Sequence, residues 1–375
     1  MASITDIKNS IPKYCQLSNI LENKISNGEL KKGKAIPSNP KLMRKYAVSQ
    51  NTVRQAINLL VQKGLLYTDQ GRGTFVSELS QTAMNNKNSG LIGVIVPSVD
   101  RPFIYSGTAF AIESEAHRKG YNILLGNANN NFVKIKKYIT SFARKNVDGI
   151  ILVPHMTSGD SEYETKNMTL IRLMRKSSIP FVFFDGYLDE IETDCVLTDN
   201  EEAGFILTEH LIKQGYKRIA FIRSSYMSSA RDRIKGYKKA LQRYALEFNE
   251  KLIIGKRNFK DIASAVNALL NSSLNVDSIV CVHDGLAVKV LDAVKERGLS
   301  VPSDIGIAGF DDNAASLNVS MPLTSIRQPV DETGKQAANL IIDKINKKIK
   351  KAKRIVLKPE LVVRSSSLRP KDITL

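Results

Sequence analysis

Residues 45–76 read KYAVSQNTVRQAINLLVQKGLLYTDQGRGTFV, and this stretch decides the fold of the N-terminal region. Ser49 is a good helix N-cap and Gly64 a good C-terminal stop. Between them, apolar residues recur at helical spacing and predict one buried helix face: Val53, Ile57, Leu60 and Val61. A short helix in KLMRKYA precedes this one, so the pair predicts a helix-turn-helix.

Two further elements complete this unit. The apolar side chains of LSNILENKI share one helix face and predict a supporting helix: Leu17, Ile20, Leu21 and Ile25. LLYT and TFV flank DQGRG, which predicts a β-hairpin with a tight, glycine-rich tip. The unit is therefore predicted to be a winged helix-turn-helix of mixed α+β structure.

In a helix-turn-helix, the second helix enters the major groove of DNA with its N-terminal residues facing the bases. Gln50 is suited to adenine, Arg54 to guanine or a phosphate, and Arg72 at the hairpin tip to the minor groove or a phosphate. The full set of expected DNA contacts is Ser38, Ser49, Gln50, Asn51, Thr52, Arg54, Gln70, Gly71, Arg72 and Gly73. Each feature alone also fits a small packing unit or a plain turn, but their combination favours DNA binding.

Charge and cysteine content agree with such a partner. The chain has 375 residues and a formal net charge of +18, and residues 1–78 hold nine Lys and three Arg against five acidic residues. This balance favours a polyanion, although a lysine-rich proteome would also produce it. Three scattered cysteines (Cys15, Cys195 and Cys281) predict no disulfide framework and no metal site. With no signal peptide and no apolar run of about 18 residues, we expect a cytoplasmic protein without a membrane span.

The remaining chain has a different pattern. Residues 79–89 are polar and aperiodic and predict a linker between a domain at 1–78 and one at 90–375. From Gly90 onward, apolar strands such as LIGVIVP and VDGIILVP alternate with amphipathic helices. This alternation predicts an α/β, doubly wound fold with parallel sheets. The run is too long for one sheet, so we expect two lobes divided near residues 193–200.

Polar residues follow several of the predicted strands. Ligands bind beyond the carboxyl ends of such strands, so we expect these tips to meet in one cleft between the lobes. The residues are Pro97, Ser98, Pro154, His155, Asp185, Arg223, Ser224, His283, Asp284, Asp311 and Asp312.

At this point a family resemblance is evident. NGELKKGKAIPS, VSQNTVRQAINLLVQKGLL and QGRGTFV resemble the winged helix-turn-helix of GntR-family transcription regulators. VDGIILVP, SSARDRIKGYKKAL and VPSDIGIAGFDD resemble the sugar-binding core of LacI-type regulators, which is similar to periplasmic binding proteins. The combination is similar to the arabinose-repressor branch of the GntR family.

The chain departs from the family pattern at several positions. Asn39 and Pro40 stand where Glu-Arg is usual, and Gln50 stands where an arginine is usual, so DNA contacts there are lost or altered. In the core, VHD replaces the usual AND, which puts His283 in place of a ligand-binding asparagine. Both side chains hydrogen-bond hydroxyl groups, so a sugar ligand still fits.

The resemblance implies ligand roles for Asp185, Arg233, His283 and Asp311. Guanidinium donors and carboxylate acceptors suit a polyol. Phe103 and Tyr105 follow the first strand and are placed to pack on a sugar ring. We expect Asp284 to act as a helix N-cap and Asp312 as a turn residue. By spacing alone, an ion pair at a helix start is the favoured role for Arg233, and the family resemblance reverses that preference.

Three function classes can be distinguished. A solute-binding protein for transport would need a secretion signal, which is missing here, and it would not need a winged head. An enzyme would need a catalytic motif, and the sequence has no GxSxG, P-loop or HExxH. We therefore expect a homodimeric regulator without cofactor, metal or catalytic residues, bound to a palindromic DNA operator. A monosaccharide such as L-arabinose or L-fucose would release it. The alternatives are an activator, or an effector that is a sugar phosphate or not a sugar.

Overall fold

The computed structural model describes residues 12–31, 33–62, 65–69, 72–77, 89–98, 104–157, 159–224, 226–255, 261–313, 317, 320–348 and 351–369. The chain divides into two compact units, Met1–Lys87 and Asn88–Leu375, which we call the head and the body. Apart from Ser89, the predicted linker lies outside the described residues. Among the described helices, none is long and apolar enough to cross a membrane.

The head is a winged helix-turn-helix, as predicted. Its elements are α1 (Lys13–Ser26), α2 (Asn39–Tyr46), α3 (Gln50–Gln62) and the antiparallel strands β1 (Leu66–Asp69) and β2 (Gly73–Val76). Leu17, Leu21 and Ile25 of α1 are buried against α3, with Ile20 packed beside them. One predicted core residue is wrong, because Val61 is 36% exposed while Ala56 is fully buried in that helix face.

Local chemistry sets the turn between α2 and α3. Pro40 lies in the first turn of α2, where a backbone N–H would have no partner within the helix. Ala47 ends that helix in the left-handed region (φ 50°), which reverses the chain within three residues. The Ser49 hydroxyl then accepts a hydrogen bond from the backbone N–H of Thr52 at 3.2 Å, so the predicted N-cap of α3 is confirmed.

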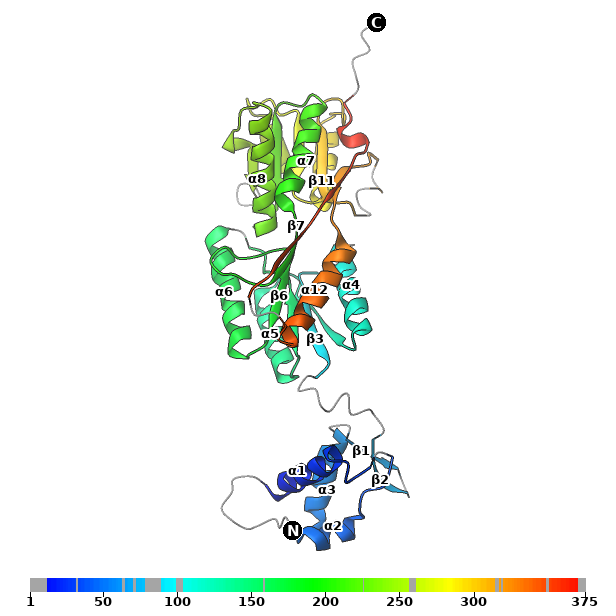
Figure 1. Ribbon diagram of the computed structural model, residues 1–375. Helices are drawn as coiled ribbons and strands as arrows, with labels where there is room; N and C mark the ends of the chain where they lie inside the picture. The colour runs from blue at the N-terminus through cyan, green and yellow to red at the C-terminus, as the bar shows by residue number, and fades with distance from the viewer. Residues whose placement is uncertain are drawn as a thin grey trace. The chain divides into compact units, whose positions relative to one another are not determined.

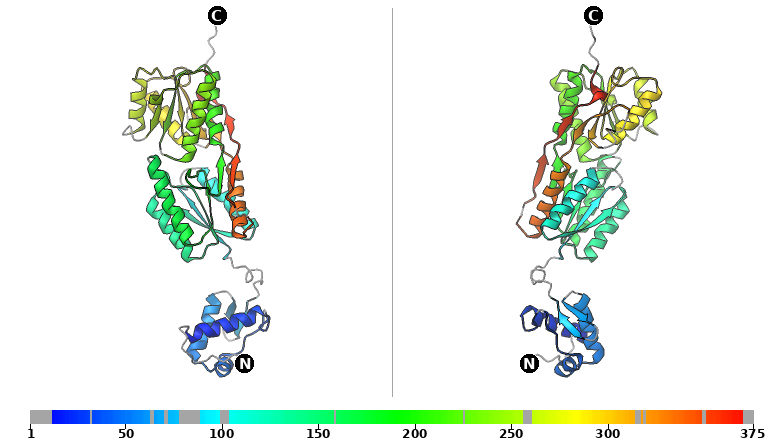
Figure 2. Two further views of the ribbon diagram at one scale, coloured as in Figure 1. Left: turned by 60° about the vertical axis from the view of Figure 1, so that its left-hand side comes forward. Right: turned by 90° about the vertical axis from the view of Figure 1, so that its right-hand side faces the viewer.

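The body contains two lobes, each built on a six-stranded sheet (Figure 1). The first sheet has the order β13-β7-β6-β5-β3-β4, and all its strands are parallel. These strands are β3 (Leu91–Val96), β4 (Asn122–Asn127), β5 (Gly149–Leu152), β6 (Phe181–Phe184), β7 (Cys195–Thr198) and β13 (Arg354–Leu357). Its helices are α4 (Ile104–Arg118), α5 (Phe132–Arg144), α6 (Asp160–Lys176) and α12 (Val330–Ile345). Figure 2 shows α12 beside α4, on one face of this sheet.

The second sheet has the order β14-β12-β11-β10-β8-β9 and is parallel except for β14. Its strands are β8 (Ile219–Arg223), β9 (Ile253–Gly255), β10 (Ser278–Cys281), β11 (Gly306–Asp311), β12 (Thr324–Arg327) and β14 (Glu360–Val362). Its helices are α7 (Asn200–Lys213), α8 (Ser228–Arg243), α9 (Ile262–Leu270) and α10 (Asp284–Glu296), with short 3-10 turns at Glu250–Leu252 and Ser365–Ser367. This architecture confirms the predicted two-lobed α/β fold.

The single division predicted near residues 193–200 describes only the first of three crossings. The chain passes to the second lobe at Asp199, returns through Gln328 and Pro329 to α12, and crosses again between β13 and β14. Sequence periodicity does not show this return, because a strand looks the same whichever sheet it joins.

Candidate effector pocket and DNA-binding surface

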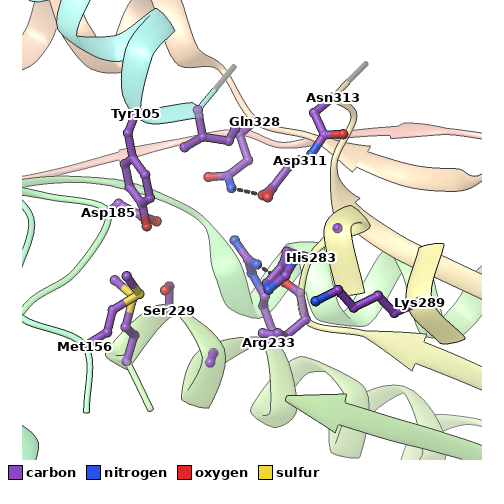
Figure 3. A pocket seen from close by; sticks show the side chains of 15 residues that line it. Tyr105, Met156, Asp185, Ser229, Arg233, His283, Lys289, Asp311, Asn313 and Gln328 are labelled. Atoms are coloured by element: carbon purple, nitrogen blue, oxygen red, sulfur yellow. Dashed lines mark hydrogen bonds between the residues drawn. The ribbon is translucent and has the colours of Figure 1, made fainter. Parts of the chain in front are cut away.

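A cavity of about 270 Å³ lies between the two lobes of the body (Figure 3). That volume is just below the range typical of drug-sized ligands, so it suits a compact molecule. Both lobes contribute to its wall: Ile104, Tyr105, Met156, Asp185, Met227, Ser229, Ala230, Arg233, Val282, His283, Gly285, Lys289, Asp311, Asn313 and Gln328.

Asp185 follows β6 and faces this cavity. Its Oδ2 accepts a hydrogen bond from the Tyr105 hydroxyl at 3.0 Å, whereas its buried Oδ1 has no partner among the described residues. Burial raises the pKa of this carboxyl group, and the nearby charge of Arg233 and the Tyr105 hydrogen bond oppose that shift. A buried acceptor without a partner is costly, so Oδ1 is suited to a hydroxyl group of a ligand.

Arg233 lies on α8 and is only 5% exposed. Its Nε donates to Oδ1 of Asn200 at 2.8 Å, its Nη1 donates to the carbonyl of Val282 at 2.5 Å, and its guanidinium lies over the Phe310 ring. These contacts replace the ion pair considered from spacing. The guanidinium is thus held at the cavity wall with further donors available.

Two glycines bring α7 close enough to α8 to place Arg233. A Cβ on Gly204 would lie 2.0 Å from the carbonyl oxygen of Arg233, and a Cβ on Gly236 would lie 1.9 Å from that of Glu201. Real Cβ contacts are essentially never that short, so the crossing of these helices requires both glycines.

His283, rather than Asp284, caps helix α10. The Nδ1 of His283 accepts from the backbone N–H of Leu286 at 3.0 Å, and its Nε2 lies 3.1 Å from the Ser224 hydroxyl. Both ring nitrogens therefore have partners within the protein, and the ring forms a fixed part of the wall. The expectation that Asp284 is the N-cap is wrong because Asp284 already belongs to the first turn and points into the core.

Asp284 is fully buried, and its hydrogen bonds connect α10 to β12 and to the segment after β11. It accepts from the Ser325 hydroxyl at 2.7 Å and from the backbone N–H of Asn313 at 3.1 Å. Burial, together with the charge of Asp311, raises the pKa of Asp284 to about 8. Asp312 pairs with Arg327 and Arg364 away from the cavity, in keeping with the structural role expected for it.

Asp311 at the end of β11 links the cavity to the connections between the lobes. Its Oδ1 accepts from the Gln328 side chain at 2.7 Å (Figure 3). Gln328 in turn accepts from the Thr198 hydroxyl at 2.9 Å. Gln328 lies in one crossing between the lobes, and Thr198 directly precedes another. Asp311 adopts φ 107°, which is strained for a residue with a side chain, and such strain often marks functional sites.

The structure brings together most of the residues singled out from the sequence. Tyr105, Asp185, Arg233, His283 and Asp311 all line the cavity, whereas Phe103 lies outside the described residues. Sequence reasoning missed several others: Met156, Ser229, Lys289, Asn313 and Gln328.

For some of these missed residues, the sequence contains a pattern that could have identified them as pocket residues. Gln328 and Asn313 follow strands, so the strand-tip argument extends to them. Lys289 projects from the middle of α10, where the sequence offers no such signal. Its ammonium group makes no hydrogen bond or ion pair with any described residue, and its side chain points toward His283 in Figure 3. His155, also a strand-tip candidate, faces away and packs against the Phe132 ring.

The head presents the predicted DNA contacts on its surface. Ser38, Ser49, Gln50, Asn51 and Arg54 are exposed, and Thr52 is half-buried beside the Ser49 hydroxyl. Arg72 is 80% exposed next to Asp69, and Gly73 adopts φ 122°, while Gln70 and Gly71 lie outside the described residues. Lys41, Arg44 and Lys45 of α2 add exposed positive charge and were not among the predicted DNA contacts.

No group of His, Cys, Asp or Glu side chains that could hold a metal ion occurs within the described ranges. The cavity itself offers donors and acceptors around a small volume, which is an arrangement for binding.

Comparisons with known proteins find a matching family for both the head and the body. The family profile for bacterial regulatory proteins of the gntR family matches residues 13–76, and that for a periplasmic binding protein-like domain matches residues 208–367. The arabinose metabolism transcriptional repressor of Geobacillus stearothermophilus is 31% identical over 366 residues, covering 96% of this chain and 98% of that protein. The HTH-type transcriptional repressor PurR of Pasteurella multocida is 32% identical over 277 residues, covering 73% of this chain and 80% of that protein.

A solved structure shows the same fold. The complex of the transcriptional regulator CelR with cellobiose covers 95% of this chain and 100% of its own, with a TM-score of 0.66 at 20% identity. The named relatives are repressors and regulators rather than enzymes, which agrees with the expectation that this chain is not an enzyme.

Proposed function

Because this chain belongs to the GntR family of transcription regulators, in the form that carries a periplasmic binding protein-like body, we propose that it is a sugar-released repressor. The head binds an operator in double-stranded DNA, and the body binds a small-molecule effector. In the absence of the effector, the protein occupies the operator in the cytoplasm and blocks transcription of carbohydrate-utilisation genes.

The cavity is the observation that carries this proposal. It sets a buried carboxylate oxygen without a described partner, at Asp185, opposite the guanidinium of Arg233 in a compact volume. Neighbouring hydroxyl groups of a sugar donate to carboxylates and accept from guanidinium groups at once. A neutral pentose or deoxyhexose, such as L-arabinose or L-fucose, matches both the size and the chemistry.

Gln328 connects the cavity to the segments that join the two lobes. It contacts Asp311 in the cavity wall and Thr198 at a second crossing between the lobes. A sugar that hydrogen-bonds Asp311 changes the partners of Gln328 and so favours one lobe arrangement over another. Effector control requires this kind of differential binding, and the operator must weaken sugar binding by the same factor.

We further propose a homodimer formed through the body. Phe110 on α4 is 71% exposed and Leu125 on the edge strand β4 is 48% exposed, which is unusual for large apolar side chains. A second copy would cover them and would place two heads on the half-sites of a palindromic operator.

A thermal-shift screen of the full chain against neutral monosaccharides and their phosphates tests this function. A ligand that binds only the folded state raises the melting temperature by mass action. The hit must also release the protein from DNA upstream of sugar-utilisation genes in a mobility-shift assay. A hit that tightened DNA binding would instead identify an activator, or a repressor that needs a corepressor.

Lys289 favours a second candidate effector, a sugar phosphate. Its ammonium group lies at the cavity wall without a carboxylate partner among the described residues, and it would pair with a phosphate. Lys289→Ala separates the two candidates. It should weaken a phosphorylated effector strongly and leave a neutral sugar nearly unaffected.

A further inference from the structure

One edge of the first lobe concentrates positive charge. Helices in βαβ units run back against the strands, so α4, α5, α6 and α12 all end where the parallel strands begin, at the lower edge of this lobe in Figure 1. Basic residues occupy these helix ends and the segment between α12 and β13. We call them the basic edge: Arg118, Lys119, Arg144, Lys145, Arg175, Lys176, Lys344, Lys347, Lys348, Lys351 and Lys353.

The strand order distributes these residues along the whole edge. Arg118 and Lys119 precede β4, residues 144–145 precede β5, residues 175–176 precede β6, and residues 347–353 precede β13. Neighbouring strands lie about 4.8 Å apart, so a sheet of this order is roughly 24 Å wide from β13 to β4. The charge therefore covers a surface about as wide as a DNA duplex.

Much of this charge is not neutralised. The side chains of Arg144, Lys145, Arg175 and Lys176 are exposed and make no hydrogen bond or ion pair with any described residue. The pKa of Lys344 is lowered by burial and by the positive charge of Arg175, although its ammonium group contacts Asp194.

Several carboxylates along the edge already have partners. Asp194 pairs with Lys344, and Glu115 pairs with Arg118. Asp343 lies 3.5 Å from Lys348. The hollow beside Arg175 also contains Glu192, which offsets part of the charge there. Positive charge remains in excess, and the excess has no partner among the residues that the structure describes.

Helix dipoles explain only part of this pattern. A basic residue in the last turn of a helix is stabilised by the carbonyl groups that end there, which accounts for residues such as Arg144 and Arg175. Lys347, Lys351 and Lys353 follow α12, and the dipole effect falls off within the last turn. Their charge calls for another partner.

The chain from the head enters the body at this same edge. The carboxylate of Asp148, just before β5, accepts from the backbone N–H of Ser89 at 2.6 Å and from that of Gly90 at 2.7 Å. This pair of bonds holds the entry point beside the start of β3. Residues 78–88 separate it from the last described residue of the head, Ser77, and they span at most about 40 Å.

We propose that the basic edge binds the phosphate backbone of the same DNA duplex that the head reads. This inference rests on the proposed DNA-binding function. The tether keeps the edge within reach of phosphates near the head's site, and lysine and arginine release counterions from DNA when they neutralise them. These contacts carry no sequence information; they add affinity and salt dependence to the selection made by the head.

The test compares two charge variants of the full chain. The edge variant carries Arg144→Gln, Lys145→Gln, Arg175→Gln and Lys176→Gln, at the ends of α5 and α6. The control variant carries Lys213→Gln, Lys217→Gln, Arg218→Gln and Arg243→Gln, exposed positions near the ends of α7 and α8 in the other lobe. Binding to a mixed-sequence duplex of about 60 base pairs is measured by fluorescence anisotropy across salt concentrations. The thermal midpoint of each variant is recorded alongside.

Each lost phosphate contact lowers the slope of log affinity against log salt by about 0.9. We expect the edge variant to lose about two or more in slope and to bind at least tenfold more weakly at physiological salt, with the control variant unchanged. An unchanged slope in the edge variant, with or without a lower thermal midpoint, would leave only the helix-dipole role and overturn the inference. So would an equal loss in both variants. If binding to phosphatidylserine vesicles is measured in parallel, a loss confined to the vesicles would overturn the inference as well.

Arg54→Ala separates a failure of this inference from a failure of the proposed DNA-binding function. If the wild-type chain binds the duplex, Arg54→Ala weakens it and the edge variant does not, then only this inference fails. If the wild-type chain does not bind duplex DNA at all, the proposed function fails as well.

Discussion

The contact between α7 and α8 leads to a quantitative prediction for Gly204→Ala. A Cβ at this position would lie 2.0 Å from the carbonyl oxygen of Arg233, whereas ordinary contacts begin near 3.4 Å. The helices must therefore separate by roughly 1.4 Å, the difference between these two distances. Overpacking of this kind costs about 1–3 kcal/mol in free energy of unfolding.

The same displacement moves a functional group. Arg233 holds Asn200 and the Val282 carbonyl through hydrogen bonds of 2.8 and 2.5 Å, which a shift above 1 Å breaks. A hydrogen bond to a charged group contributes about 1.5–3 kcal/mol. We therefore expect effector affinity to fall roughly tenfold or more while the head, a separate compact unit, keeps its affinity for DNA.

Differential scanning calorimetry and isothermal titration with the effector measure these two effects. The body should melt several degrees lower, since about 1 kcal/mol shifts the midpoint of a domain this large by roughly 2–4 °C. Glu202→Ala, at an exposed position on the same helix, is the matched control. If Gly204→Ala kept both the midpoint and the effector affinity of the wild type, the close approach of these helices would not be what places Arg233.

Four further substitutions test the head, the pocket, the core and the connection between lobes. Arg54→Ala removes an exposed side chain without intramolecular partners among the described residues, so folding should be unaffected. Operator affinity should fall by about 1–3 kcal/mol in a mobility-shift titration. Asn58→Ala, one turn further along α3, is the control. Asp185→Asn should weaken the effector at least tenfold, and it should abolish the loss of affinity that the wild type shows as acid protonates this carboxylate, whose pKa burial raises. The pKa of Asp284 is raised to about 8, so the folded state keeps a proton that the unfolded state loses at lower pH. The free energy of unfolding should therefore fall as pH rises from about 4 to 8. Asp284→Asn should flatten this pH dependence when stability is measured by urea titration. Gln328→Leu should leave the effector bound but reduce its release of DNA, and a normal release would rule out this side chain as the link.

Local patterns in the sequence were sufficient for the head. Its helix faces, the Ser49 cap and the hairpin depend on neighbours a few residues apart, and the structure reproduces them. The error at Val61 shows where such reasoning stops. The residue lies at the border of the helix face, and only the packing of α1 decides that Ala56 is buried in its place.

In the body, the sequence by itself determined the α/β alternation and the polar residues at strand ends, because parallel strands put their carboxyl ends on one side. That argument identified Tyr105, Asp185, His283 and Asp311 as pocket residues, and the family resemblance identified Arg233. Only the tertiary structure decided that α12 and β13 return to the first lobe and that Gln328 joins the pocket to two crossings. It also decided that His283 caps α10 and that Lys289 faces the cavity. These features depend on which distant segments pack together, and short-range periodicity carries no information about that choice.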